Sequence, residues 1–480
     1  MEMYFRAYLT DNRYNHITYM KRFFIAIAAA MLSGAFAFAQ SVIPFTNGDR
    51  AVYLGDSITD GGHYHSYIWL YYMTRFPYMD LTVVNAGIGG NTASDMYERL
   101  DGDVFIHEPT VLMVTFGMND TGYMEYNQEG AEKYGEKRYR EACDNFDKIE
   151  KRLLALDNVH IVMVGGSPYD ETAQIEGNVA FKGKNAVMDR IVAYQKAAAE
   201  RNGWDFVDFS KPLVEVSAKM QAEDPSFTLT MGDRIHPDND GHMVMAYLFL
   251  KAQGFAGRKV ADIEVDAATS NVVKSENCAI SDVQKDRKGI SFSYLAESLP
   301  YPLDTVARGF GAHRGQAGAL KMVPFMEEMN QETLKVTGLE GKYNLYIDDQ
   351  LLGSWDGKNL AEGINMAELT WSPQYQQALQ VMYLNEWRWE IERSFRDFAW
   401  MQFGFLKPLG CLDNNDRRAV EAIDRHKAEN IWAGIHRDTY ARLMYEEVRD
   451  TRIAEMNMLT DKIYQINKPV EHRISLRLSL

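Results

Sequence analysis

Short apolar runs alternate with segments of helical period over residues 50–254 of this 480-residue chain. The apolar runs are rich in Val, Ile and Phe, which favours strands buried on both faces. They cover residues 51–55, 81–86, 111–116, 160–164 and 206–209. The helical segments between and after them cover about residues 64–75, 92–101, 129–155, 176–201 and 240–253. Five strands with intervening helices predict an α/β fold with a doubly wound parallel sheet.

The pattern changes from about Asp266 onward. Residues 290–294, 333–337 and 343–347 alternate apolar and polar positions as strands do, and turns with Gly and Asp separate them. After Pro373, large apolar residues recur every three or four positions: Tyr383, Trp387, Ile391, Phe395 and Phe398. A packed helix face explains this stripe more simply than a surface for stacking sugars. One long charged helix is predicted over residues 436–465, so the C-terminal part is expected to be an α+β accessory region.

The first forty residues carry the pattern of an export signal. Met20 is followed by Lys21 and Arg22, residues 23–37 are apolar, and residues 37–39 (Ala-Phe-Ala) form a small-x-small cleavage signal. The apolar run is short for a membrane span, which disfavours an uncleaved anchor. We therefore expect translation to start at Met20, cleavage before Gln40, and a secreted or periplasmic protein.

The resulting organisation has four parts. Residues 1–39 are expected to be a signal peptide with an upstream extension, and residues 40–260 the α/β domain. Residues 261–370 are expected to form a small β-rich domain, and residues 371–480 a helical C-terminal region.

Charge and cysteine content narrow the classes of function. The chain has 51 Lys and Arg against 67 Asp and Glu, a formal charge of −16, and so lacks the basic surface of a nucleic-acid binder. No membrane insertion is expected after signal cleavage. Cys143, Cys278 and Cys411 lie far apart without C-x-x-C spacing. Three cysteines allow one disulfide, but their spacing indicates neither a disulfide framework nor a zinc site.

Polar and glycine-rich motifs follow the first three predicted strands. Gly-Asp-Ser57 follows the first, Gly-Ile-Gly-Gly-Asn-Thr (residues 87–92) the second, and Asn119 the third. Ligands of doubly wound sheets bind beyond the carboxyl ends of the strands, so these groups are expected near one another. Taken singly, each is explained equally well by a turn or a helix cap. The glycine loop lacks the Gly-Lys-Ser/Thr of a phosphate loop, so a nucleotide role is poorly supported.

A fourth motif, Asp233-Arg-Ile-His236, precedes the last helix of the α/β part. An Asp three residues before a His can accept a hydrogen bond from the imidazole Nδ1–H and leave Nε2 facing a serine. Alone, it would be explained by a turn beside a surface histidine.

In this order, the four motifs resemble the SGNH (GDSL-like) hydrolase family over about residues 45–255. The resemblance implies a flavodoxin-like fold and a catalytic triad of Ser57, Asp233 and His236. It further implies an oxyanion hole made by the N–H groups of Ser57 and Gly90 and the side-chain amide of Asn119. Gly89 is the alternative to Gly90. No metal and no cofactor are implied.

A metal site is the competing interpretation of several nearby residues: His63, His65, His242, Asp238 and Asp240. The first two histidines start a predicted helix, where capping or solvent exposure is expected. The two aspartates have only a fragment of the spacing of a calcium loop. We therefore predict no metal.

The predicted function is a secreted serine esterase that hydrolyses carboxylic esters, a carbohydrate O-acetylesterase in its leading form. Its partner is expected to be an acylated small molecule or glycan, and the oligomeric state is left open. Export and the C-terminal region, which is similar to extensions of some secreted bacterial SGNH proteins, motivate the glycan; no specificity residue does. The alternatives are a lipase-, arylesterase- or methylesterase-like acylhydrolase, or a non-catalytic glycan-binding module.

Overall fold

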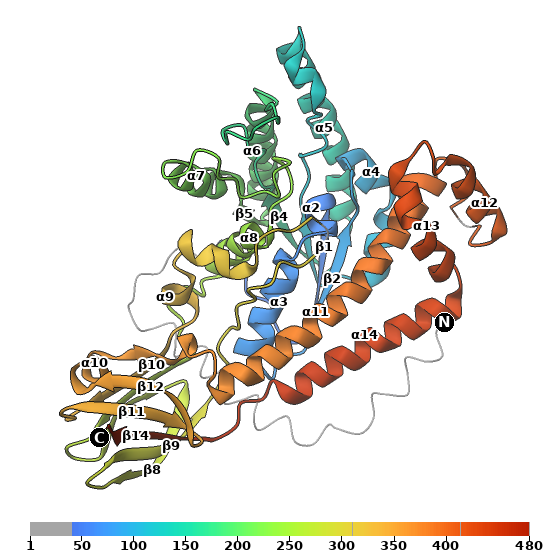
Figure 1. Ribbon diagram of the computed structural model, residues 1–480. Helices are drawn as coiled ribbons and strands as arrows, with labels where there is room; N and C mark the ends of the chain where they lie inside the picture. Colours follow the sequence, from blue (N-terminus) through green and yellow to red (C-terminus); the bar gives the residue numbers. More distant parts are fainter. Residues whose placement is uncertain (1–40, 310, 413, 480) are drawn as a thin grey trace. The chain divides into compact units, whose positions relative to one another are not determined.

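Five parallel strands form the central sheet of the α/β part (Figure 1). The computed structural model describes residues 41–309, 311–412 and 414–479. The strands are β1 (Asp49–Gly55), β2 (Leu81–Gly87), β3 (Val111–Val114), β4 (His160–Gly165) and β5 (Asp205–Asp208). They lie in the order β2-β1-β3-β4-β5, and every neighbouring pair is parallel. This is the order of flavodoxin-like sheets, and the predicted fold class is confirmed.

Alternate side chains of each strand enter two separate apolar cores. In β1, Ala51 and Tyr53 belong to one core, and Val52 and Leu54 to the other. Successive side chains of a strand point to opposite faces of the sheet, so a strand covered on both faces must be apolar at every position. This is why apolar residues dominate both faces of the five strands in the sequence.

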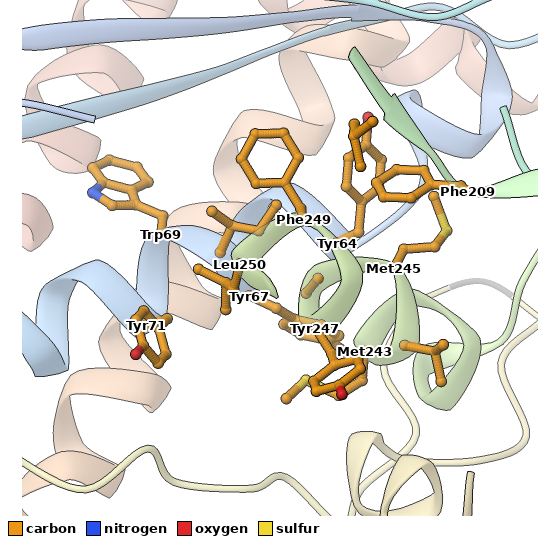
Figure 2. Packing of buried hydrophobic residues seen from close by; sticks show 14 of the residues in the cluster. Tyr64, Tyr67, Trp69, Tyr71, Phe209, Met243, Met245, Tyr247, Phe249 and Leu250 are labelled. Carbon is orange, nitrogen blue, oxygen red and sulfur yellow. The ribbon is translucent and has the colours of Figure 1, made fainter. Parts of the chain in front are cut away.

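Helices close both cores. The first core is covered by α3 (Tyr64–Arg75) and α8 (Asn239–Ala252), whose side chains interdigitate in Figure 2. The second is covered by α4 (Ala93–Glu98), α5 (Ala131–Leu153) and α6 (Lys184–Asn202). These five helices overlap the five predicted ones. An additional helix that the sequence did not indicate, α7 (Ser210–Gln221), follows β5.

The edge strand β2 is covered by side chains of α11 (Pro373–Ala399), which lies beside it (Figure 1). Glu392 accepts a hydrogen bond from the N–H of Asn85 at 3.0 Å. Arg396 donates to the carbonyl oxygens of Asn85 and Gly87, at 3.0 Å each. Unpaired N–H and C=O groups of an edge strand would otherwise be open to pairing with another chain. Polar side chains of α11 thus take the place of a sixth strand.

The stripe of large apolar residues on α11 is only partly a packed face. Ile391 is 1% exposed, whereas Tyr383 and Trp387 are 54% and 50% exposed. The expectation of a packed face is therefore wrong at Tyr383 and Trp387, near the middle of the helix. There the buried face includes polar side chains such as Asn385 and Glu386, which a search for apolar periodicity does not detect.

Two further sheets form the β-rich part. One has four strands in the order β13-β10-β6-β7, and the other five in the order β12-β11-β14-β9-β8. The predicted strands at 290–294, 333–337 and 343–347 are β9 (Gly289–Ala296), β10 (Glu332–Thr337) and β11 (Lys342–Ile347). The others are β6 (Ala261–Asp266), β7 (Asn271–Glu276), β8 (Cys278–Lys285), β12 (Gln350–Asp356), β13 (Ile364–Asn365) and β14 (His472–Leu478). All six residues of β7 are exposed, so no apolar alternation marks it.

The predicted long helix over 436–465 is two helices, α13 (Ile431–Leu443) and α14 (Glu446–Ile466), so that prediction is wrong. Tyr445 between them is extended, with φ −83° and ψ 127°. Tyr440 in α13 packs in a cluster of C-terminal side chains, while Ile463 in α14 packs in the first core of the α/β part. The chain turns because its two halves bury their apolar faces in different places.

Residues 41–480 form one compact unit, and β14, which lies beyond residue 370, pairs with β9 and β11. The domain boundaries at 260 and 370 stay predictions. The signal peptide and the start at Met20 lie outside the described residues. Cys143, Cys278 and Cys411 are free thiols. Within the described ranges, no helix is long and apolar enough to cross a membrane.

Candidate active site

Ser57 lies at the carboxyl end of β1, as the first residue of the short helix α2 (Ser57–Asp60). The Asp56 side chain caps this helix by accepting from the N–H of Ile58 at 3.0 Å. Gly55 is required by the sharp turn, since a Cβ there would lie 2.1 Å from Oγ1 of Thr59. The turn leaves Ser57 half-buried, with its N–H at the open start of a helix, where no intrahelical acceptor exists.

His236 lies between Ser57 and Asp233. Its Nε2 is 2.8 Å from Oγ of Ser57, and its Nδ1 is 2.5 Å from Oδ2 of Asp233. The other carboxylate oxygen of Asp233 accepts from the N–H groups of Ile235 and His236, at 2.9 Å each. With Nδ1–H donating to the carboxylate, Nε2 is left to accept from the serine hydroxyl. The three residues predicted from two distant motifs therefore form one hydrogen-bonded chain.

The loop that carries this pair is anchored by Arg234, which the sequence interpretation did not single out. Arg234 is 3% exposed and has φ +69°, a strained conformation for a residue with a side chain. Its guanidinium makes four hydrogen bonds, all to oxygens of three residues: Asp170, Ala173 and Asn178. Its carbonyl accepts from the N–H of Asp170 at 2.9 Å. These bonds tie the loop to the segment that follows β4.

The electrostatics of the pair suit a general base. Burial would lower the pKa of His236, but the hydrogen bond and charge of Asp233 outweigh it and raise this pKa above its ordinary value. Burial would raise the pKa of Asp233, but its hydrogen bonds to His236 and Ile235 and the charge of His236 lower it. The arrangement thus favours an ionised carboxylate that stabilises the imidazolium.

The glycine loop after β2 presents two N–H groups with different surroundings. The N–H of Gly89 donates to Oδ2 of Asp60 at 2.9 Å, and the carbonyl of Gly89 accepts from Nε1 of Trp400 at 3.2 Å. Gly90 is exposed and has φ +81°, which glycine adopts without strain. Its N–H has no acceptor in the described part of the chain. Of the two glycines, Gly90 is therefore the one with a free donor.

Asn119, in the turn after β3, is oriented through its whole side chain. Its Oδ1 accepts from the hydroxyl of Tyr123 at 2.6 Å, and its Nδ2 donates to the carbonyl of Asn91 at 3.0 Å. An amide nitrogen carries two hydrogens, so one remains for a ligand. The bond to Asn91 places Asn119 beside the glycine loop.

A buried lysine supports the turn that carries Asn119. The ammonium of Lys184 donates to the carbonyls of Met118 and Gly122, at 2.6 and 2.7 Å, and to the hydroxyl of Thr121. Burial lowers the pKa of Lys184 to about 7. A cation at the start of α6 is unfavourable for the helix dipole; the three bonds and the nearby charges of Asp120 and Asp56 act against this cost.

The histidines considered as metal ligands are packed instead. His63 stacks on Trp389 with ring centroids 3.8 Å apart, and His242 stacks on an aromatic ring of α3. Nε2 of His65 lies 3.0 Å from the carbonyl oxygen of Thr59, and burial lowers the pKa of His65 to about 4. His63 is the N-cap residue of α3, although its side chain makes no capping bond; the expectation of solvent exposure is wrong, because His63 and His65 are both buried.

Asp238 and Asp240 bind groups of the protein. Asp238 accepts from the N–H groups of His313 and Arg314, and Asp240 pairs with the Arg314 guanidinium at 2.5 Å. Across the described residues, no group of three His, Cys, Asp or Glu side chains could hold a metal ion.

Two sets of supporting residues were missed by the sequence interpretation. Asp60 and Tyr123 lie within four residues of Ser57 and Asn119, so proximity to a motif is a signal that could have found them. Trp400 and Arg393, which pairs with Asp60 at 2.9 Å, lie more than 300 residues from the motifs they contact. No local pattern points to them.

Known proteins match both the α/β part and the C-terminal helical region of this chain. A sequence model of the GDSL-like Lipase/Acylhydrolase family matches residues 53–244. A solved structure described as a gut microbial diltiazem-metabolizing enzyme is 59% identical, covers 92% of this chain and 100% of its own, and superposes with a TM-score of 0.90. The chain belongs to the GDSL-like lipase/acylhydrolase family. It is accordingly a carboxylic ester hydrolase, which confirms the predicted family and enzyme class.

This GDSL-like esterase has further relatives. Residues 379–468 match the family named for the C-terminal helical domain of diltiazem deacetylase. An acetylxylan esterase of Geobacillus stearothermophilus is 27% identical over 224 residues, which cover 44% of this chain and 95% of the relative. An uncharacterized lipoprotein of Bacillus subtilis (strain 168) is 33% identical over 99 residues, covering 19% of this chain and 40% of that protein.

Proposed function

We propose that this esterase removes acetyl groups from O-acetylated alcohols with Ser57 as nucleophile, His236 as general base and Asp233 as the group that orients it. The observation that carries the proposal is the continuous hydrogen-bonded chain from Oγ of Ser57 through both imidazole nitrogens to Asp233. A nucleophile, a base within hydrogen-bond reach and a third group that orients the base are the requirements of serine esterase chemistry.

The reaction proceeds in two halves. Nε2 of His236 takes the proton of Ser57 as Oγ attacks the ester carbonyl, and the carbonyl oxygen becomes an oxyanion. The imidazolium then gives its proton to the leaving alcohol, and the C–O bond breaks to leave an acyl-enzyme. Water, deprotonated by His236, attacks the acyl group and releases acetate, and the proton returns to Ser57.

Three donors stabilise the oxyanion in this proposal: the N–H groups of Ser57 and Gly90 and the free amide hydrogen of Asn119. The choice of Gly90 over Gly89 is supported by the bond from Gly89 N–H to Asp60, which occupies that donor. Preorganised donors stabilise charge that exists only in the transition state, so they raise kcat more than they lower KM.

An acetylated glycan is the leading substrate, supported by the acetylxylan esterase that matches the α/β part and by the expected export. Cleavage before Gln40, and a secreted or periplasmic location, belong to this proposal; the relative described as a lipoprotein is in keeping with export. Sequencing the N-terminus of protein from its native host tests this, and retention of residues 20–39 would contradict it.

Deacetylation of diltiazem is a second candidate. It is favoured by the relative that is 59% identical over nearly the whole chain and by the family match of the helical region. Both candidates share an acetyl ester and a bulky alcohol. Long-chain lipase-like activity is the alternative that shares the same triad but not the small acyl group.

The test compares wild type with Ser57→Ala, and uses Ser226→Ala, an exposed serine, as the matched control. Release of 4-nitrophenol from its acetate, and of acetate from acetylated xylan and from diltiazem, is measured for each. We expect Ser57→Ala to lose activity on every substrate while Ser226→Ala keeps it. Turnover by a folded Ser57→Ala variant would contradict the proposed nucleophile. A wild type that releases acetate from neither xylan nor diltiazem would contradict the substrate assignment alone.

A further inference from the structure

The peptide unit between Gly89 and Gly90 links the helical C-terminal region to the candidate oxyanion hole. The carbonyl of Gly89 and the N–H of Gly90 belong to the same planar trans peptide, so they point in opposite directions. Nε1 of Trp400 donates to that carbonyl at 3.2 Å. A bond that fixes the carbonyl therefore also fixes the direction of the Gly90 N–H.

The preceding peptide unit, which contains the N–H of Gly89, is held through Asp60 by Arg393 of α11. Gly89 donates its N–H to Oδ2 of Asp60 at 2.9 Å, and the other oxygen of Asp60 accepts from Nη1 of Arg393 at 2.9 Å. Asp60 is buried, which raises its pKa, and the positive charges of Arg393 and Arg396 act against that rise. Arg393 thus helps to keep Asp60 ionised and in place as the acceptor for Gly89.

The loop needs this support because two consecutive glycines have wide conformational freedom. Gly90 itself is exposed, and a Cβ placed on it would meet nothing within 4 Å, so no packing restrains it. Trp400 reaches the loop where α11 passes into a π-helical segment, Trp400–Leu406. A Cβ built on Gly89 would lie 3.8 Å from Cδ1 of Trp400 and 3.9 Å from Cβ of Ser57, so the indole and the nucleophile both border this glycine.

We propose that Trp400 and Arg393 are positioning residues that aim the Gly90 N–H at the oxyanion, so that the helical region is part of the active site. The inference rests on the proposed function, in which Gly90 is an oxyanion donor. Neither residue touches the reacting atoms. Their effect passes through the two peptide groups of Gly89.

Trp400→Phe tests the proposal, because it removes the indole N–H and keeps an aromatic ring. We expect kcat on 4-nitrophenyl acetate to fall about 10- to 100-fold with KM changed less than about threefold, as for a misdirected transition-state donor. Trp432→Phe is the matched control. Trp432 is a half-exposed tryptophan on α13 that, like Trp400, lies against His436 but makes no hydrogen bond to the glycine loop. It should retain wild-type kcat.

Binding of phenylboronic acid separates positioning from a general loss of structure. The boronate adduct of the serine is tetrahedral and places a charged oxygen where the oxyanion forms. Its Kd should rise in Trp400→Phe by about the factor by which kcat falls, while thermal unfolding of the variant stays close to that of Trp432→Phe. Arg393→Met, which leaves Trp400 in place, should weaken boronate binding in the same direction.

A folded Trp400→Phe variant with kcat and boronate affinity within about twofold of wild type would overturn the proposal. If that variant does not fold, unchanged kcat and boronate affinity in Arg393→Met would overturn it. These results differ from a failure of the proposed function, in which Ser57→Ala would remain active.

Discussion

Replacing Asn119 by alanine removes the only side-chain donor of the proposed oxyanion hole. In the structure, one amide hydrogen of Asn119 is bound to the carbonyl of Asn91 and the other has no partner in the described residues. The free hydrogen forms a full bond only when the carbonyl oxygen becomes charged. Loss of one such donor lowers kcat by about 10²–10³, or roughly 2.7–4 kcal/mol of transition-state stabilisation, with a smaller change in KM.

Asn119→Ala should also lower the folding stability, by less than it lowers the stabilisation of the transition state. Asn119→Ala loses the bonds to Asn91 and to the Tyr123 hydroxyl, each worth about 1 kcal/mol of folding stability. Tyr123→Phe is the matched control, because it removes only the bond that orients the amide. It should lower kcat by less than about tenfold, since the donor itself remains.

The assay is steady-state hydrolysis of 4-nitrophenyl acetate by wild type and both variants, with urea unfolding to measure stability. A folded Asn119→Ala enzyme with wild-type kcat would refute the role of Asn119. An equal loss of kcat in Tyr123→Phe and Asn119→Ala would show that the effect comes from the conformation of the turn that carries Asn119, and not from its free amide hydrogen.

Three further predictions follow from the loop of His236 and from the proposed substrate. Because the pKa of His236 is raised, the imidazolium persists to higher pH than in an ordinary histidine, so kcat/KM should fall on acidification around an apparent pKa above about 6.5. Asp233→Asn should move this acidic fall in kcat/KM to lower pH and lower kcat about 10²–10⁴-fold. An unchanged pH profile in Asp233→Asn would contradict the dependence of the His236 pKa on Asp233. Arg234→Met should reduce the free energy of unfolding by about 3 kcal/mol, measured with urea, because four hydrogen bonds are lost, two of them buried and two part-buried. A loss below about 1 kcal/mol would show that the loop does not depend on them. The value of kcat/KM should fall steeply from acetyl to butyryl and octanoyl reporter esters, and acetate should be released from a glycan at least as fast as from the chromogenic ester. A preference for octanoyl esters, with no acetate released from any glycan, would favour a lipase-like enzyme.

The α/β part was predictable because its information is local. Apolar residues dominate both faces of each strand, each motif directly follows a strand or precedes a helix, and the ends of parallel strands meet at one edge. The resemblance to the SGNH family implied that Ser57 and His236, 179 residues apart, meet, and Nε2 of His236 lies 2.8 Å from Oγ of Ser57. The β-rich part was predicted less completely, since strands such as β7 are exposed on both faces and lack alternation.

The amino-acid sequence determined the parallel sheet, its two apolar cores and the four motifs, because burial and turn formation depend on residues that are close in the chain. Only the tertiary structure decided that α11 covers β2, and that Trp400 and Arg393 hold the glycine loop. Those contacts depend on how a helix more than 300 residues further along the chain packs against the sheet. They also depend on polar side chains whose partners, backbone groups and the buried carboxylate of Asp60, have no sequence signature. Hydrophobic periodicity records which face of a helix is apolar, but it does not record which buried polar group will meet which carbonyl.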